Sequence, residues 1–251
     1  MALFKSGNPA LGEKIFSGNY NLQETGAMTE RGTINKFGLM MLLLLASATF
    51  TWKAAMEGKD VYSWMIASLV GGIIVFIALL FKKEWAFFLA PIYGLIEGVF
   101  LGGISAIYNN VFEKYAPNIV MQAVGLTFGV VIAMFALYQF GVIKATERFK
   151  SIVITATFGI AIFYGLALLL RLFGIQMPLI HESTTMGIIF SLVVVGIAAL
   201  NLILDFDRIE QGSKMGAPKY MEWYCAFGLL VTIVWLYLEI LRLLSKLADR
   251  R

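Results

Sequence analysis

Long apolar runs separated by short polar connections are the feature that most limits what this 251-residue chain can fold into. A helix needs roughly 20 apolar residues to cross the hydrocarbon core of a bilayer. The polar groups of a lipid-exposed backbone must also hydrogen-bond within the protein, which only helices and closed barrels achieve. Because the runs are too long for barrel strands, we predict transmembrane helices. The first run is short unless its helix begins before Phe37 or continues past Lys53. The seven runs lie near 37–52, 61–81, 85–108, 119–140, 151–172, 186–206 and 220–244.

The composition supports the same fold class. The chain is 59% hydrophobic and 14% charged, with a mean hydropathy of +0.80, whereas a soluble domain carries about 25% charged residues. We therefore predict an all-α integral membrane protein, a seven-transmembrane-helix bundle that spans 37–251 as one domain. Residues 1–36 are predicted to form a polar, flexible N-terminal tail. The lipid bilayer is the expected partner, and nucleic acid is not, because no basic cluster is interleaved with exposed aromatic residues.

The residues that enzymes and metal sites need are scarce. The chain has one histidine, His181, and one cysteine, Cys225, so neither a disulfide framework nor a usual zinc site can be assembled. His181 falls in a connection predicted over 176–183. No phosphate-binding loop or Ser–His–acid set is present. We expect no enzyme and no cofactor beyond transiently bound Ca²⁺ or protons.

The positive residues are unevenly divided between the two sets of loops. Eight follow helices two, four and six, against four (Lys53, Lys59, Lys114 and Arg171) after helices one, three and five. The positive-inside rule then predicts that the N-terminus is cytoplasmic. The cluster of cations at the C-terminus argues the other way unless the last helix re-enters the membrane. The eight are Lys82, Lys83, Lys144, Arg148, Lys150, Arg208, Lys214 and Lys219.

Glu97 lies near the middle of the third run, beside a stripe of small residues. The stripe of Gly94, Gly98 and Gly102 recurs every four residues, and such stripes let helix backbones approach closely. Glu97 is about 100° around the helix from the stripe and is predicted to face the protein interior. An ionised carboxylate there is costly unless it is paired, hydrated or protonated. Glu97 is therefore either a hydrogen-bonded structural acid or a cation or proton site.

Two acids close the sixth run. Asp205 follows Asn201 by four residues, so the two side chains share one helix face. Asp207 points roughly 200° away from Asp205 on an ideal helix and is expected to lie closer to water. Arg208 can extend its long side chain to the interface. Asp205 is either a helix-end acid or a functional one, whereas a helix-end role suits Asp207.

The seventh run carries Thr232 near its centre and Glu239 seven residues later, on the same face. Arg242 at i+3 and Lys246 at i+7 can compensate the charge of Glu239. If each run is centred in the membrane, Asp205 lies on the cytoplasmic side and Glu239 on the outer side. The acids would then form a ladder along the membrane normal, which suits hard cations such as Ca²⁺ or protons.

Three stretches together resemble one family, the Bax inhibitor-1/YccA proteins, also called transmembrane Bax-inhibitor-motif proteins. Residues 93–105 look like the glycine-rich third helix of that family, and 135–139 with 146–149 resemble its fourth-to-fifth helix junction. Leu204-Asp205-Phe-Asp207-Arg-Ile209-Glu is similar to the acidic motif that closes helix six. The resemblance covers roughly 37–251, maps the family acid onto Asp205, and leaves Asp207 as an addition. This chain would be a bacterial-type member with a long polar N-terminal tail.

The second acid of the family lies in helix seven, and two alignments place it differently. Matching Leu236-Tyr-Leu-Glu239 assigns it to Glu239, whereas matching the Leu-rich segment and its Arg to Ile240-Leu-Arg242 puts Thr232 there. The second alignment gives the shorter spacing from Asp205 that relatives have, and the depth argument also favours it. The pH-sensitive pair of carboxylates of the family would then lack one member here.

The resemblance implies a function that the residues alone do not. It implies a seven-helix bundle with helix seven at its centre that acts as a pH-sensitive Ca²⁺ leak. Asp205 and Glu97 would be the Ca²⁺ ligands, with Glu239, Asp207, Thr232 and Asn201 along the ion pathway. It also implies an alternative: a non-conducting regulator of stress response or membrane-protein quality control that binds a membrane protease or another membrane protein.

Overall fold

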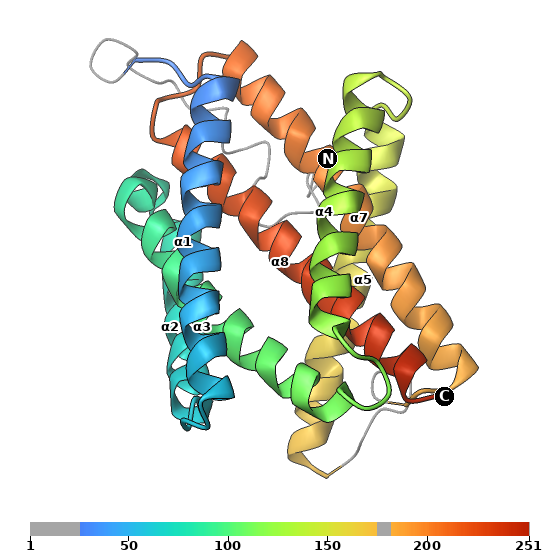
Figure 1. Ribbon diagram of the computed structural model, residues 1–251. Coiled ribbons are helices and arrows are strands. Elements are labelled where there is room, and N and C mark those ends of the chain that lie inside the picture. Colours follow the sequence, from blue (N-terminus) through green and yellow to red (C-terminus); the bar gives the residue numbers. More distant parts are fainter. Residues whose placement is uncertain (1–25, 175–181, 251) are drawn as a thin grey trace. The chain divides into compact units, whose positions relative to one another are not determined.

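The structure is a computed structural model that describes residues 26–174 and 182–250 (Figure 1). Within these residues it holds seven helices that are each long and apolar enough to span a membrane, and no strand beyond one isolated bridge. This confirms the all-α transmembrane fold. The short 3-10 turn η2, Lys83–Trp85, leads into α3. The helices are α1 Glu30–Met56, α2 Tyr62–Phe81, α3 Ala86–Phe112, α4 Ile119–Gln139, α5 Glu147–Leu172, α7 Thr185–Lys214 and α8 Met221–Ala248.

Many large apolar side chains on these helices are exposed on the protein surface. In water a surface this apolar would drive aggregation, whereas in a bilayer the same side chains contact acyl chains. Lipid is therefore the environment that the helices require. Examples are Leu42 on α1, Ile74 on α2, Ile132 on α4, Leu168 on α5 and Leu192 on α7.

Helix α1 begins earlier than its apolar run. Thr29 is its N-cap and accepts a hydrogen bond from the Gly32 amide at 3.0 Å. The helix then continues past Lys53 to Met56, which gives 27 residues, or about 40 Å at 1.5 Å per residue. The segment 30–36, assigned to the tail from its polarity, is thus helical. Residues 1–25 of the predicted tail lie outside the described residues.

The prediction that the sixth transmembrane helix, α7, ends with its apolar run at 206 is wrong. The helix continues to Lys214, so Asp205 and Asp207 lie within it rather than at its end. Arg208 is 1% exposed, so it does not extend to the interface as expected. The reason is that six further helical residues follow it before the chain turns.

The contacts divide the described chain into two compact units. The α1–α3 unit comprises 26–110 and 207–231, and the α4–α5 unit comprises 111–206 and 232–250. Helix α8 contributes its first half to one unit and its second half to the other. It is also the most buried helix: 67% of its most apolar stretch is buried, against 44% for α7, the next highest. The family resemblance implied such a role for the seventh helix.

In the α1–α3 unit, the glycine stripe of α3 packs against α1. A Cβ at Gly94 would lie 3.1 Å from the carbonyl oxygen of Met40. A Cβ at Gly98 or Gly102 would overlap the α1 backbone outright. The first half of α8 packs in the same unit through Phe227, whose ring meets that of Tyr93 edge-on at 4.9 Å. Glycine is therefore required on this face of α3 because the two helix backbones touch.

In the α4–α5 unit, α5 and α7 share a small core. Val153 and Ile154 of α5 are buried together with Leu204 of α7. Two residues further along α7, the Phe206 ring contacts that of Phe135 on α4, with centroids 5.4 Å apart. This packing fixes which face of α7 points inward, and Asn201 and Asp205 lie on that buried side.

Candidate functional site

The Asn201–Asp205 face of α7 is the centre of the candidate site. Asp205 is 0% exposed and Asn201 is 2% exposed. The Asn201 amide Nδ2 donates to Thr157 Oγ1 on α5 at 2.8 Å and to the Ile197 carbonyl at 2.8 Å. Thr157 in turn donates to the Val153 carbonyl at 2.8 Å. The site is therefore a buried carboxylate beside an amide that α5 holds in place.

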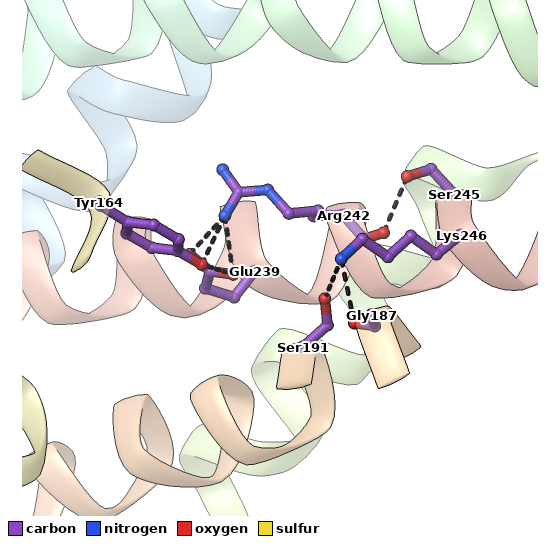
Figure 2. Close-up of polar contacts among 7 residues, drawn as sticks. All are labelled: Tyr164, Gly187, Ser191, Glu239, Arg242, Ser245 and Lys246. Atoms are coloured by element: carbon purple, nitrogen blue, oxygen red, sulfur yellow. Dashed lines mark hydrogen bonds and ion pairs between the residues drawn. The ribbon is translucent and has the colours of Figure 1, made fainter. Parts of the chain in front are cut away.

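Glu239, on α8, belongs to an ion pair within the α4–α5 unit (Figure 2). Arg242 Nη1 lies 3.0 Å and 3.1 Å from the two carboxylate oxygens. The Tyr164 hydroxyl donates to Glu239 Oε2 at 3.1 Å and accepts from Arg242 at 2.7 Å. The expected pair at i and i+3 is thus present. The bridging tyrosine is on α5, and no sequence pattern predicts it because its approach depends on how the helices pack.

Lys246, one turn beyond Arg242, is buried rather than part of an exposed C-terminal cluster. Its ammonium donates to the Gly187 carbonyl at 3.0 Å and to Ser191 Oγ at 2.9 Å, both on α7 (Figure 2). Ser183 and Asp249 add a hydrogen bond of 2.6 Å nearby. The end of α8 is therefore fastened to the start of α7. The spacing of seven from Glu239, which puts Lys246 on the same face, was the available signal.

Glu97 lies in the α1–α3 unit and faces α2. The Tyr93 hydroxyl hydrogen-bonds to its carboxylate from one turn earlier. A Cβ at Gly72 on α2 would lie 3.3 Å from Glu97 Oε2. The carboxylate thus lies against α2, while the glycine stripe of the same helix packs on α1. The small size of Gly72 is what lets the carboxylate approach the α2 backbone this closely.

Glu222, in the first turn of α8, is a buried carboxylate that the sequence did not single out. Its side chain is 0% exposed. The Thr29 amide and hydroxyl both donate to Oε1 at 2.9 Å, Lys219 lies 2.8 Å from Oε1, and Lys36 pairs with Oε2. Gly32 gives the carboxylate access to the first turn of α1, because a Cβ there would overlap it. Only the nearby Lys219, three residues earlier, was visible as a sequence signal.

Comparison with known protein families decides the family. The family model described as Bax inhibitor 1 like matches residues 8–249, nearly the whole chain. The chain belongs to this family. No curated protein and no solved structure matched the chain.

The Bax inhibitor 1-like match spans both units and every position that the resemblance singled out. Asp205, Thr232 and Glu239 belong to the α4–α5 unit, where Thr232 is buried on α8. Glu97 and Asp207 belong to the α1–α3 unit, and Asp207 accepts a 2.6 Å hydrogen bond from Gln211 on its own helix. With Asn201, the structure therefore places four of the six proposed pathway residues in the α4–α5 unit and two in the α1–α3 unit.

Metal ligation stays a prediction for this Bax inhibitor 1-like chain. Among residues 26–174 and 182–250, no three His, Cys, Asp or Glu side chains cluster in a way that could hold a metal ion. His181 lies outside those ranges. A cation at Asp205 or Glu97 would thus rely on one carboxylate, with neutral oxygens and water completing its shell.

Proposed function

We propose that this Bax inhibitor 1-like protein is a passive, pH-sensitive cation leak channel and that Ca²⁺ is the ion it conducts. The observation that carries the proposal is the complete burial of Asp205 within a membrane-spanning helix, next to the amide of Asn201. An ionisable side chain inside a membrane is costly, and such residues mark ion and proton pathways. We propose a channel rather than an enzyme.

Each acid has a proposed role in this pathway. Asp205 is the gate acid on the cytoplasmic side, and its protonation removes a negative charge and shifts the balance between closed and open states. Glu97 is a second site near the middle of α3, and Asp207 supports the cytoplasmic end. Glu239 is the outer site, where a cation has to displace Arg242 from its 3.0 Å contact. With Thr232 in place of the second family acid, the pH response rests on Asp205.

Flux through reconstituted protein tests the proposal. Liposomes that contain the wild-type protein should leak Ca²⁺, and those with Asp205→Asn should leak it more slowly and without pH dependence between acidic and neutral pH. Asp249→Asn is a matched control, because Asp249 is bonded to Ser183 at the far end of α8. Equal flux from wild type and Asp205→Asn at every pH would end the assignment of Asp205.

The alternative is a non-conducting regulator that binds a membrane protease or another membrane protein through its N-terminal tail. The docking of 26–29 supports it: the Met28 amide donates to the Ala217 carbonyl at 2.7 Å, and Thr29 is held by Glu222. Residues 26–29, at the end of the tail, are thus fixed to the α1–α3 unit. Deleting residues 2–25 keeps these contacts and discriminates, because a leak should survive the deletion and a tail-mediated interaction should not.

We further propose that the protein lies in a bacterial inner membrane with its N-terminus in the cytoplasm. Lys82 and Lys144 lie in the connections that follow α2 and α4, and Lys219 follows α7, as the positive-inside rule requires for cytoplasmic loops. Arg208 and Lys214, counted with the loops from sequence, belong to α7. A protease-accessibility assay on inverted membrane vesicles, with a tag at the N-terminus, checks this orientation.

A further inference from the structure

The side-chain amide of Asn201 is held in one orientation. The atom that lies 2.8 Å from the Ile197 carbonyl also lies 2.8 Å from Thr157 Oγ1. A peptide carbonyl can only accept, so this atom must be the amide nitrogen. Thr157 uses its own hydrogen to donate to Val153 at 2.8 Å, so it presents a lone pair to Asn201. A flipped amide would place an oxygen against two acceptors, and the orientation is therefore fixed.

This orientation leaves the amide oxygen of Asn201 as a buried acceptor. Oδ1 has no hydrogen-bond donor among the described residues, although the side chain is only 2% exposed. Leaving such an acceptor unbonded costs about 1–3 kcal/mol. Leucine branches at the same carbon and carries no acceptor, so it avoids that cost, although it is the larger side chain. The two hydrogen bonds of Nδ2 offset that cost, but they give Oδ1 no role in the packing of α7.

Asp205 lies one turn along the same face of α7. Residues four apart on a helix have Cβ atoms roughly 6 Å apart, so a single ion can contact both side chains. Carboxylate and amide oxygens are the ligands that hard cations bind. We infer that Asn201 Oδ1 and the Asp205 carboxylate together bind a partly hydrated hard cation, with Thr157 positioning the amide. This inference rests on the proposed function and assigns its cation-binding residues.

Two protein ligands suit an ion that must also leave. Ca²⁺ takes six to eight oxygen ligands, so most of its shell at this site remains water. Conduction needs binding that is strong enough to admit an ion and weak enough to release it. A neutral amide beside one carboxylate meets that need better than two carboxylates would. Thr157, on α5, makes the geometry of the site depend on how α5 packs against α7.

Calorimetric titration of the purified full-length protein with Ca²⁺ tests the inference without relying on conduction. Asn201→Leu should weaken Ca²⁺ binding roughly tenfold or more, as expected when a supporting ligand is lost. Asn201→Asp should strengthen it by adding charge. Thr157→Val should weaken it by a smaller factor, and Thr157→Ser should restore it, because serine keeps the hydroxyl. Asn201→Leu combined with Thr157→Val removes both hydrogen-bonding partners and should behave like Asn201→Leu alone.

Measurements of Ca²⁺ flux through liposomes with the same variants distinguish the cation site from the proposed leak. Unchanged Ca²⁺ binding in Asn201→Leu overturns the inference, and the leak still stands if Asp205→Asn slows the flux and removes its pH dependence. Weaker binding in Asn201→Leu without any flux from the wild type supports the cation site and overturns the leak. Wild-type protein that neither binds nor conducts Ca²⁺ overturns both. If Asn201→Leu weakens Ca²⁺ binding but Thr157→Val binds as tightly as the wild type, the positioning role of Thr157 is overturned.

Discussion

Glu222 and Asn201 are buried polar groups, one in each unit, and they differ in how far hydrogen bonds offset the free-energy cost of burial. In the α1–α3 unit, both oxygens of Glu222 are bonded, by Thr29, Lys36 and Lys219. In the α4–α5 unit, the amide nitrogen of Asn201 is bonded twice, whereas no donor among the described residues reaches its oxygen. A buried charge stabilises a fold only when its partners are complete. The comparison therefore separates a structural position from one that is suited to a ligand.

The surroundings of the two groups agree with that distinction. Glu222 lies at the start of two helices, where the amide ends of α1 and α8 favour a negative charge. It ties the first turn of α1 to the first turn of α8. Asn201 is instead within the body of α7 and close to a second buried acid, Asp205.

Glu222→Ala should cause the largest loss of stability. It leaves Thr29 without its acceptor and two lysines without their counter-ion, and breaking a buried pair costs about 3–5 kcal/mol. Lys219 is half-exposed and Lys36 partly so, which places the loss near the lower end of that range. The measurement is chemical unfolding in detergent micelles, with Ca²⁺ binding by the folded fraction expected to remain.

Glu57→Ala is the matched control. Glu57 pairs with Lys59 at 2.7 Å in the same unit, but both side chains are exposed. Exposed pairs contribute at most about 1 kcal/mol, so this variant should unfold almost as the wild type does. Equal losses from Glu57→Ala and Glu222→Ala would show that the partners of Glu222 do not stabilise the fold.

Lys246→Met tests what makes a buried polar group structural: complete hydrogen bonding, or its place in the α1–α3 unit. Lys246 shares the α4–α5 unit with Asn201, but it donates to Gly187 and Ser191. Methionine keeps the stem and leaves two buried acceptors without a donor, at a cost of about 1–3 kcal/mol. We expect lower stability and unchanged Ca²⁺ binding. A variant with normal stability and impaired binding would place Lys246 with Asn201 instead.

Tyr164→Phe should have a smaller effect. The phenol links Glu239 and Arg242, which also contact each other at 3.0 Å without it. Loss of one hydroxyl between bonded partners costs about 1 kcal/mol. Thermal unfolding measures this change. A much larger loss would show that the ion pair depends on the tyrosine.

Hydropathy predicted the helices well but missed their polar extensions. Runs 61–81 and 119–140 agree with α2 and α4 to within one residue at either end. Helix α7, however, continues eight residues past its apolar run, because polar side chains buried by protein do not register as hydrophobic. The true stop signal is Gly216, whose φ of 65° only glycine adopts readily. Lys214 in the last turn completes that signal.

Local partners in the candidate site could be predicted, and distant ones could not. The spacing of Asn201 and Asp205, and of Glu239 and Arg242, follows from the helical repeat alone. Thr157 and Tyr164 are on α5, and their contacts depend on how that helix is rotated against α7 and α8, which a single sequence does not encode locally. Glu222 was missed for the same reason, since its donors come mainly from α1.

Asn201→Leu completes the comparison with the smallest expected change in stability. The substitution loses two hydrogen bonds from Nδ2, each contributing about 1 kcal/mol, and removes a buried acceptor that costs about 1–3 kcal/mol. These terms nearly cancel, so the free energy of unfolding should change by about 1 kcal/mol or less, in either direction. A loss as large as that of Glu222→Ala would show that a donor already satisfies Oδ1 in the folded protein. The amide would then be structural, and the contrast between the two units would disappear.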